Sequence, residues 1–246
     1  MVRETIDGIL RQTNLKNESK QYLAKREELR LAEIELRNVR EKVAELRRQL
    51  PPGAIVDDYE FAEGPASLDA SDAPARKVRL SELFTSPDRS LVIYHLMYGK
   101  KQTTPCPMCT AWIDSFNGVA HHLAQNVDLA VVAAAGVPEL RAHARTRGWD
   151  KLRLLSAGES SFKYDLGSED AEGRQDSTIS VFTRDKEGTL RHFYSGHPWL
   201  ADDIKERGID ELIPVWNVLD LTPQGRGTWY ASLDYGTKVQ AARSTP

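Results

Sequence analysis

The strongest structural signal in the chain is the apolar run Leu91-Val92-Ile93-Tyr94-His95-Leu96-Met97. A near-continuous run of this kind is typical of a strand that is buried on both faces of a sheet. A loop at residues 98–105 leads from this run to Cys106-Pro107-Met108-Cys109, after which apolar residues recur at helical spacing. The sequence therefore predicts a buried strand, a loop and a Cys-x-x-Cys pair that opens a helix.

Further strands are predicted on both sides of this run. Apolar or alternating patterns place them at residues 55–62, 77–80, 128–135, 152–156, 177–184 and 189–194. The last two form a hairpin, because Asp185-Lys186-Glu187-Gly188 supplies residues that favour a turn.

Helical segments are predicted between and after these strands. We expect a helical turn capped by Ser81, a helix from Pro138 to Gly148 and a last helix at residues 209–219, with loop at residues 64–75 and 158–176. Alternating strands and helices followed by a hairpin and a closing helix are the layout of a thioredoxin-like α/β sandwich.

The first fifty residues have a different pattern. An apolar residue recurs every seven positions, at Leu15, Tyr22, Leu29, Leu36, Val43 and Leu50. This spacing predicts one long amphipathic helix of about nine turns with a coiled-coil-like stripe, and the prolines at positions 51 and 52 end it. We therefore expect a helical extension at residues 1–52 and a thioredoxin-like domain at 53–246. The helix is interpreted as a solvated amphipathic helix that lies on its own domain, as an arm that pairs two copies in a homodimer, or as a nucleic-acid arm.

The composition excludes several classes of protein. Of the 246 residues, 40% are apolar and 28% charged, which fits a globular chain and neither a disordered nor a collagen-like one. The net charge of −3 argues against a nucleic-acid binder. The longest uncharged apolar stretch, residues 129–138, is far shorter than the roughly 20 residues of a membrane helix. With no secretory signal at the start of the sequence, we expect a cytoplasmic protein with no membrane partner.

The only two cysteines, Cys106 and Cys109, stand three positions apart. A pair so close closes a tiny loop, so chemistry is a better reason for it than architecture. Free N–H groups and the positive end of the helix dipole stabilise a thiolate there, and Pro107 fits the first turn, where its missing donor costs nothing. Two buried structural thiols and a metal site remain as alternatives. No nucleotide-binding glycine motif or second cysteine pair occurs, so no cofactor is expected.

Other residues are candidates to support the pair. His95 ends the buried run and His192 lies in the predicted hairpin, so either one is a candidate base that lowers a thiol pKa. A soft metal such as copper would suit Cys106, Cys109 and either His192 or His95 as ligands. The alternative for each histidine is a hydrogen-bonded structural role, and Trp112 is expected to pack under the pair.

Five ordered segments together resemble a known family. They are Ile93-Tyr94-His95-Leu96-Met97-Tyr98-Gly99, Pro105-Cys106-Pro107-Met108-Cys109, His122-Leu123-Ala124, Arg147-Gly148-Trp149 and Leu219-Asp220-Leu221-Thr222-Pro223-Gln224-Gly225-Arg226-Gly227. The chain is similar over nearly its whole length to the thioredoxin-like family catalogued as domain of unknown function 899. The resemblance implies a thioredoxin-like fold without a settled reaction.

Two better-known families of this superfamily suggest roles for the cysteines. By similarity to thioredoxins, Cys106 attacks and Cys109 resolves. By similarity to peroxiredoxins, Cys109 before Thr110 stands at the peroxide-attacking position, and Cys106 replaces the threonine of that motif. The chain also departs from thioredoxins at residues 176–182, which contain no proline where those proteins carry a cis-proline.

The favoured interpretation is a thiol–disulfide oxidoreductase that cycles Cys106 and Cys109 between dithiol and disulfide. Its substrate would be a thiol, a disulfide or a peroxide, and an unidentified reductant would return it to the dithiol. The alternatives are a metal-binding protein, a peroxidase that uses Cys109, and a module without enzymatic activity whose cysteines sense the redox state.

Overall fold

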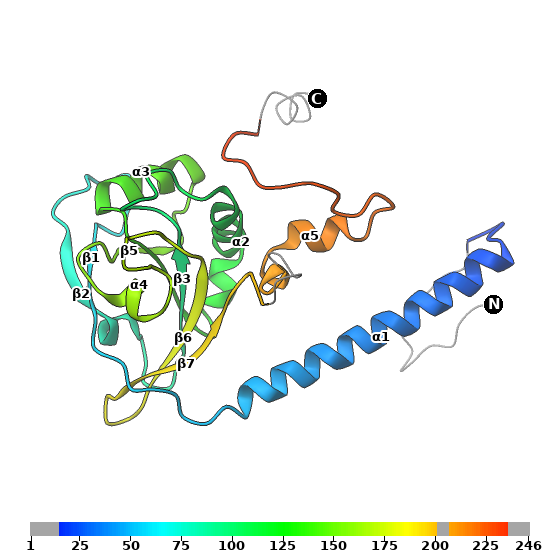
Figure 1. Ribbon diagram of the computed structural model, residues 1–246, viewed down its shortest axis with the longest axis horizontal. Helices are drawn as coiled ribbons and strands as arrows, with labels where there is room; N and C mark the ends of the chain where they lie inside the picture. Colours follow the sequence, from blue (N-terminus) through cyan, green and yellow to red (C-terminus); the bar gives the residue numbers. More distant parts are fainter. Residues whose placement is uncertain (1–14, 201–206, 236–246) are drawn as a thin grey trace. The chain divides into compact units, whose positions relative to one another are not determined.

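The computed structural model describes residues 15–200 and 207–235, and the chain divides into two compact units, Met1–Pro51 and Pro52–Pro246 (Figure 1). None of the described helices combines the length and the apolar composition that a membrane span needs.

The first unit contains one long helix, α1 (Lys20–Arg48). Ser19 caps it by accepting a hydrogen bond from the Tyr22 backbone N–H at 3.1 Å. Good helix formers fill the interior, and ion pairs such as Arg30–Glu27 span single turns. The predicted apolar stripe is exposed, and α1 has no buried residue.

The second unit is built on a mixed seven-stranded sheet in the order β2-β1-β5-β4-β3-β6-β7. Its strands are β1 (Glu60–Glu63), β2 (Arg76–Arg79), β3 (Leu91–Leu96), β4 (Asp128–Ala133), β5 (Arg153–Ser156), β6 (Thr178–Arg184) and β7 (Leu190–Gly196). β3, β4 and β5 run parallel, whereas β6 is antiparallel to β3 and to β7. The order β4-β3-β6-β7 with these directions is the core of a thioredoxin-like sheet, as the sequence predicts.

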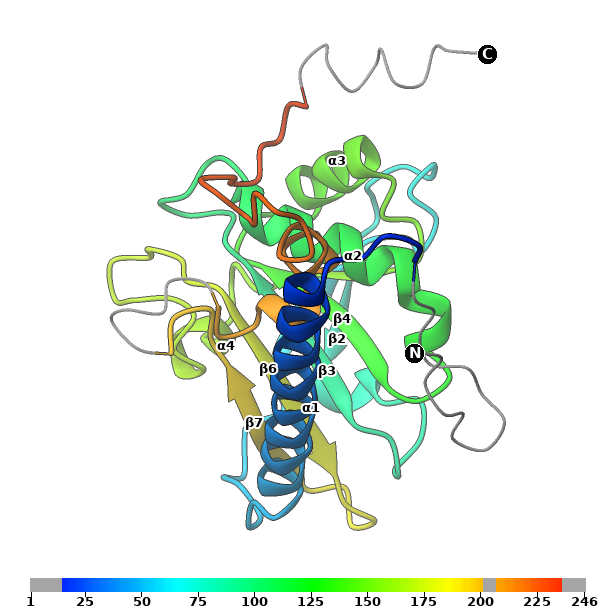
Figure 2. The same ribbon diagram turned by 90° about the vertical axis from the view of Figure 1, so that its right-hand side faces the viewer.

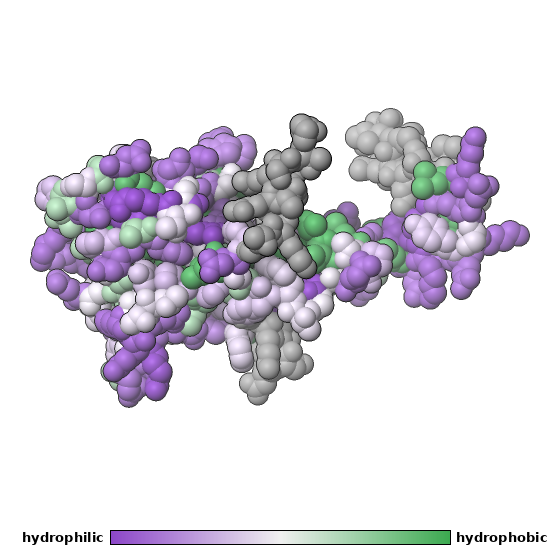
Figure 3. Space-filling view, turned by 90° about the horizontal axis from the view of Figure 1, so that it is seen from above, coloured by the Kyte–Doolittle hydropathy of each residue, from purple (hydrophilic) through white to green (hydrophobic). Residues whose placement is uncertain are grey.

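Helices and loops cover both faces of this sheet. The α-helices are α2 (Pro107–Leu123), α3 (Val137–Arg147), α4 (Phe162–Asp165) and α5 (Pro214–Leu219). α2 and α3 lie side by side (Figure 2), and Thr110 of α2 hydrogen-bonds His143 of α3 at 3.1 Å. Hydrophilic side chains cover most of the face of this unit seen in Figure 3.

Two hydrophobic clusters lie on the two faces of the sheet. Tyr94 and Leu96 of β3 belong to the cluster beneath α2 and α3, whereas Leu91 and Ile93 belong to the other, which contains Phe162 of α4. This alternation along β3 follows from the period of two in a strand. β3, which is buried except for the half-buried Val92, therefore presents successive residues to two different environments.

Four sequence predictions differ from the structure. The strand expected at residues 55–62 begins only at Glu60. The turn expected at Ser81 is a 3-10 helix, Leu80–Leu83, whose N-cap residue is Arg79, and the Glu82 carboxylate accepts a hydrogen bond from the Arg79 backbone N–H at 2.6 Å. The loop expected at residues 158–176 contains α4. The last helix is a 3-10 turn, Asp210–Leu212, followed by α5, because Pro214 lacks the N–H that a continuous helix requires.

Candidate functional site

The cysteine pair lies at the start of α2, which follows β3 in the chain after the loop that begins at Met97. Cys106 is the N-cap residue with extended backbone, and Pro107 occupies the first turn. The Cys106 Sγ accepts a hydrogen bond from the Cys109 backbone N–H at 3.4 Å. Both cysteines are free thiols; Cys106 is partly exposed and Cys109 is buried. The sequence prediction of a thiol pair at a helix N-terminus is confirmed.

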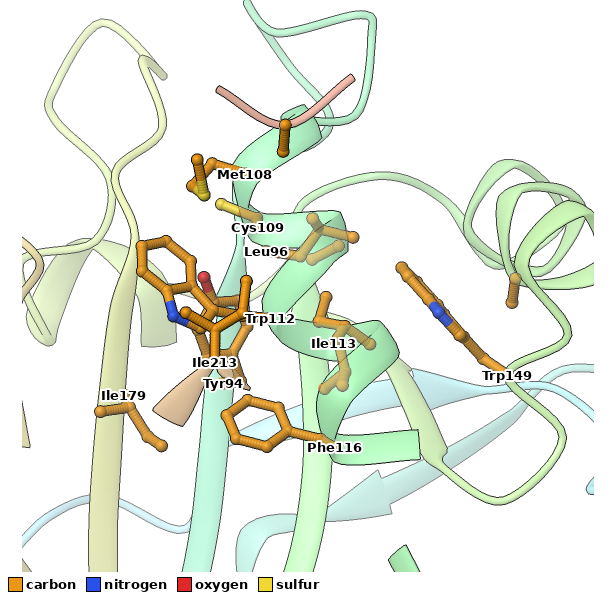
Figure 4. Close-up of a cluster of buried hydrophobic side chains, with 14 of the residues drawn as sticks. Tyr94, Leu96, Met108, Cys109, Trp112, Ile113, Phe116, Trp149, Ile179 and Ile213 are labelled. Carbon is orange, nitrogen blue, oxygen red and sulfur yellow. The ribbon is translucent and has the colours of Figure 1, made fainter. Parts of the chain in front are cut away.

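Four hydrogen-bond donors converge on the buried sulfur of Cys109. Burial on its own raises the pKa of this thiol, but the donors outweigh it and lower the pKa to about 7. The donors are the Cys106 thiol, the Met97 backbone N–H, the Tyr94 hydroxyl and the Ser177 hydroxyl. Figure 4 shows Cys109 on the first turn of α2, near Tyr94 and Trp112.

The pKa values of the two thiols shift in opposite directions. The hydrogen bond from Cys106 to Cys109 raises the pKa of Cys106, and burial of the Cys106 side chain acts in the same direction. The backbone N–H groups of Cys109 and Met108 oppose this effect. Cys109, the less exposed of the two, is thus the more acidic thiol of the pair.

A cavity of about 370 Å³ opens beside the pair. Most of the residues that line this cavity are apolar or aromatic, and they include one acid–histidine contact. The lining residues are Met97, Cys106, Met108, Cys109, Trp112, Asp176, Ser177, His197, Pro198, Trp199 and Tyr230. The His197 Nε2 lies 3.0 Å from the Asp176 Oδ2. A cavity of this size suits a small molecule or a single side chain.

The structure places both predicted histidines away from the cysteines. His95 is buried, with its ring nitrogens 2.6 Å from the Ser168 hydroxyl and 3.1 Å from the Ser180 hydroxyl. Its ring stacks on Phe162, which belongs to the cluster on the opposite face of the sheet from Cys109. The expectation that His95 acts as a base for the thiols or as a metal ligand beside them is therefore corrected: it has the alternative, structural role.

His192 also packs on that opposite face. Its ring lies 5.9 Å from the ring of Phe182, and its Nε2 lies 2.8 Å from the Ser195 hydroxyl. Residues 15–200 and 207–235 contain no group of three or more His, Cys, Asp or Glu side chains that could hold a metal ion. The proposed set of Cys106, Cys109 and His192 does not fit a metal, and we derive no chemistry through one.

The other supporting candidates have packing roles. Trp112 is buried between Tyr94 and Trp216, with ring centroids 6.2 Å and 5.9 Å away. The Thr110 hydroxyl donates to the Cys106 carbonyl at 2.9 Å and contacts His143, so it holds the first turn of α2 against α3.

Sequence reasoning missed the residues that surround the sulfurs. Tyr94 and Ser177 form a hydrogen bond of 2.9 Å with each other as well as contacting Cys109. Asp176 and Ser177 come directly before β6, at the place where the sequence lacks the proline of thioredoxins. That departure is the one signal that marks this segment, and it does not indicate which atoms point toward the thiols.

One family model matches almost the whole chain. It is described as "Bacterial protein of unknown function (DUF899)" and it matches residues 12–241. No curated protein matches the chain.

Several solved peroxiredoxin structures are similar to the chain at low identity. Reduced Prx3 of Vibrio vulnificus in complex with hydrogen peroxide is 17% identical, with 65% of this chain and 92% of that chain covered and a TM-score of 0.45. AhpC of Mycobacterium tuberculosis is 15% identical, with coverages of 70% and 93% and a TM-score of 0.45. The 2-Cys peroxiredoxin of Plasmodium vivax is 13% identical, with coverages of 69% and 96% and a TM-score of 0.45.

Proposed function

The chain belongs to the DUF899 family, and we propose that within this family it acts as a thiol–disulfide oxidoreductase. The observation that carries the proposal is the asymmetric pair at the start of α2. Cys106 is partly exposed, and its partner Cys109 is buried with its pKa lowered to about 7 by four donors. Such a pair has a nucleophile that a substrate can reach and a base already hydrogen-bonded to it.

The reaction follows from the hydrogen bond between the two sulfurs. Cys106 attacks one sulfur of a disulfide substrate while its proton passes to Cys109. The substrate S–S bond breaks, and the first leaving thiolate takes that proton from Cys109. The Cys109 thiolate then attacks the Cys106 sulfur of the mixed disulfide and releases the second thiolate, which is protonated by solvent. The substrate gains two electrons, and an external dithiol restores Cys106 and Cys109.

The size of the cavity limits the substrate. A volume of about 370 Å³ admits one small disulfide or one side chain of a larger one. Its wall of Met97, Met108 and Trp199 favours an apolar or aromatic group beside the reacting sulfur.

Trapping of the mixed disulfide tests this order of events. In Cys109→Ser the resolving sulfur is lost, so a small aromatic disulfide is expected to leave a stable adduct on Cys106, detected by mass. In Cys106→Ser the same reagent is expected to react far more slowly, because Cys109 is buried. A stable adduct on Cys109 and none on Cys106 would reverse the assignment, and failure of the wild type to form its internal disulfide would remove the function.

A peroxidase that uses Cys109 is the second candidate. The observation that favours it is that the lowered pKa belongs to Cys109, which is among the residues that line the cavity beside the pair. In that reaction the Cys109 thiolate attacks the O–O bond, an alkoxide or hydroxide leaves and takes a proton, and Cys106 then displaces water from the sulfenic acid. Cys106→Ser should then accumulate a sulfenic acid on Cys109 when peroxide is added, which the disulfide mechanism does not predict.

A further inference from the structure

The reaction proposed above makes no use of Lys163, although its place in the fold is unusual for a lysine. It lies on α4 with only 1% of its surface exposed. Lysine is almost never fully buried unless it is paired. Its Nζ lies 3.4 Å from the Leu96 carbonyl oxygen, at the end of β3.

The Leu96 carbonyl belongs to the same peptide group as the Met97 N–H. That N–H is one of the four donors to the Cys109 sulfur. The ammonium of Lys163, the Leu96–Met97 peptide and the Cys109 sulfur therefore form one chain of hydrogen bonds. A cation at the carbonyl end of a peptide polarises the group, and its N–H becomes a better donor to an anion at the other end.

We propose that Lys163 is a positioning residue for the thiol pair, and that its buried ammonium stabilises the Cys109 thiolate through the Leu96–Met97 peptide. This role rests on the proposed function only because that function is what makes use of the Cys109 thiolate. The effect on the sulfur itself does not depend on any substrate.

The charged and titratable groups around Lys163 are consistent with this role. Burial lowers the pKa of Lys163 to about 8, and Cys109, Glu169 and Asp176 act in the opposite direction, whereas Lys100 adds to the lowering. Glu169 is paired with Lys100, and Asp176 contacts His197. On the same face of β3 as α4, the buried ring of His95 has its pKa lowered first by burial and then by Lys163, so it stays neutral.

Both carboxylates are thus already engaged, and the Cys109 thiolate is the anion left to balance the Lys163 charge. Between the two pKa values, about 7 for Cys109 and about 8 for Lys163, the sulfur is ionised while the lysine is still protonated. Each charge favours the other, because coupling between two sites is reciprocal.

The test is a titration of the Cys109 thiol in the full chain carrying Cys106→Ser, so that a single thiolate absorbs in the ultraviolet. Lys163→Met removes the charge, and Lys163→Gln removes it while keeping a donor for the Leu96 carbonyl. Both are expected to raise the Cys109 pKa by about one unit, as for a unit charge several ångströms away in the protein interior. Lys151→Met, the same change at an exposed lysine between α3 and β5, is expected to leave it in place.

An unchanged Cys109 pKa in either folded Lys163 variant would overturn the proposal. Reciprocity gives a second measurement that needs no change at Lys163: Cys109→Ser is expected to lower the Lys163 pKa, followed by NMR of labelled lysine. An equal Lys163 pKa with and without the thiolate would also overturn it. If the thiol pKa shifts but no disulfide is reduced, the proposed function fails and the electrostatic role stands. If disulfides are turned over while the thiol pKa stays unshifted, the proposed function stands and the electrostatic role fails.

Discussion

Tyr94→Phe removes a single oxygen atom from the surroundings of the reactive sulfur. Tyr94 is fully buried on β3, and its hydroxyl contacts both the Cys109 sulfur and the Ser177 hydroxyl. Burial, followed by the charge on Cys109, raises the pKa of Tyr94 far above its usual value, so the phenol stays protonated and acts as a donor. Phenylalanine keeps the ring, which packs 5.6 Å from the ring of Phe116, and loses only the donor.

The expected magnitude follows from the number and kind of donors. A hydrogen bond to a charged group contributes about 1.5–3 kcal/mol, and one pKa unit corresponds to about 1.4 kcal/mol. Loss of one of four donors should therefore raise the Cys109 pKa by about one to two units, from about 7 to between about 8 and about 9. At neutral pH the thiolate fraction would fall from about one half to about one tenth or less.

Thiolate absorbance against pH measures the shift as the difference between Cys106→Ser and Cys106→Ser with Tyr94→Phe, because Cys106→Ser itself alters one of the four donors. Tyr164→Phe is the matched control, because Tyr164 is exposed on α4. A Cys109 pKa that stays at its wild-type value in folded Tyr94→Phe would refute the reasoning, since the negative charge would then not lie on the sulfur that Tyr94 contacts.

Three further predictions concern the scaffold. Because burial holds the pKa of His95 well below 6.5, the unfolded chain binds more protons in acid than the folded chain does. The free energy of unfolding should therefore fall by up to about 1.4 kcal/mol per pH unit below pH 6.5. Urea titrations should show that stability depends less steeply on pH in His95→Gln. Gly99 has φ +106°, and a Cβ there would lie 2.1 Å from the Ala135 nitrogen, so Gly99→Ala should cost about 3 kcal/mol. Gly118 lies in open space within α2, so Gly118→Ala should stabilise the protein by about 1 kcal/mol. Thermal melts of the two variants measure both effects. The proposed pairing of two copies through α1 predicts that Leu36→Glu on its exposed stripe converts a dimer to a monomer in sedimentation; a wild type that is already monomeric contradicts it.

Those parts of the site that depend on local sequence could be predicted. The buried run of β3 and the position of Pro107 at a helix start are set by neighbours within a few residues, so the thiol pair and its helix were recognisable. The hairpin of β6 and β7 was recognisable for the same reason, because its turn residues lie together in the sequence.

The face of the sheet on which each strand residue places its side chain could not be predicted. His95 is separated from Tyr94 by one peptide, yet it faces the opposite cluster, because neighbouring residues in a strand point to opposite sides. A register shift between Val181 and Phe182 brings His192 opposite Phe182. A change of one residue in register reverses which face a side chain occupies, and the sequence contains no signal for it.

Contacts between residues far apart in the sequence could not be predicted either. Asp176 meets His197 across 21 positions, and Lys163 reaches the Leu96 carbonyl across 67. A lysine on a short helix within a polar segment has the sequence pattern of a solvated residue. Only the packing of α4 against the end of β3 makes it a buried cation.

The contacts of the Cys109 thiolate also determine how oxidising the pair is. Donors to the thiolate stabilise the dithiol state alone, because the charge disappears when the Cys106–Cys109 disulfide forms, and a stabilised reduced form makes a disulfide a stronger oxidant. Removing a donor should therefore favour oxidation. For Tyr94→Phe, above the pKa of the thiol, a tenfold change in thiolate stability corresponds to about 30 mV for the two-electron couple.

Equilibration with glutathione buffers, followed by alkylation and mass analysis, measures this shift. Tyr94→Phe should be oxidised at a more reducing poise than the wild type, and Tyr164→Phe at the same poise. If Tyr94→Phe were oxidised at the same poise as the wild type, or at a more oxidising one, the negative charge would not be confined to the reduced pair. Because the donors to Cys109 act on both its ionisation and the stability of its disulfide, thiol pKa and redox poise are expected to change together in every variant that alters these contacts.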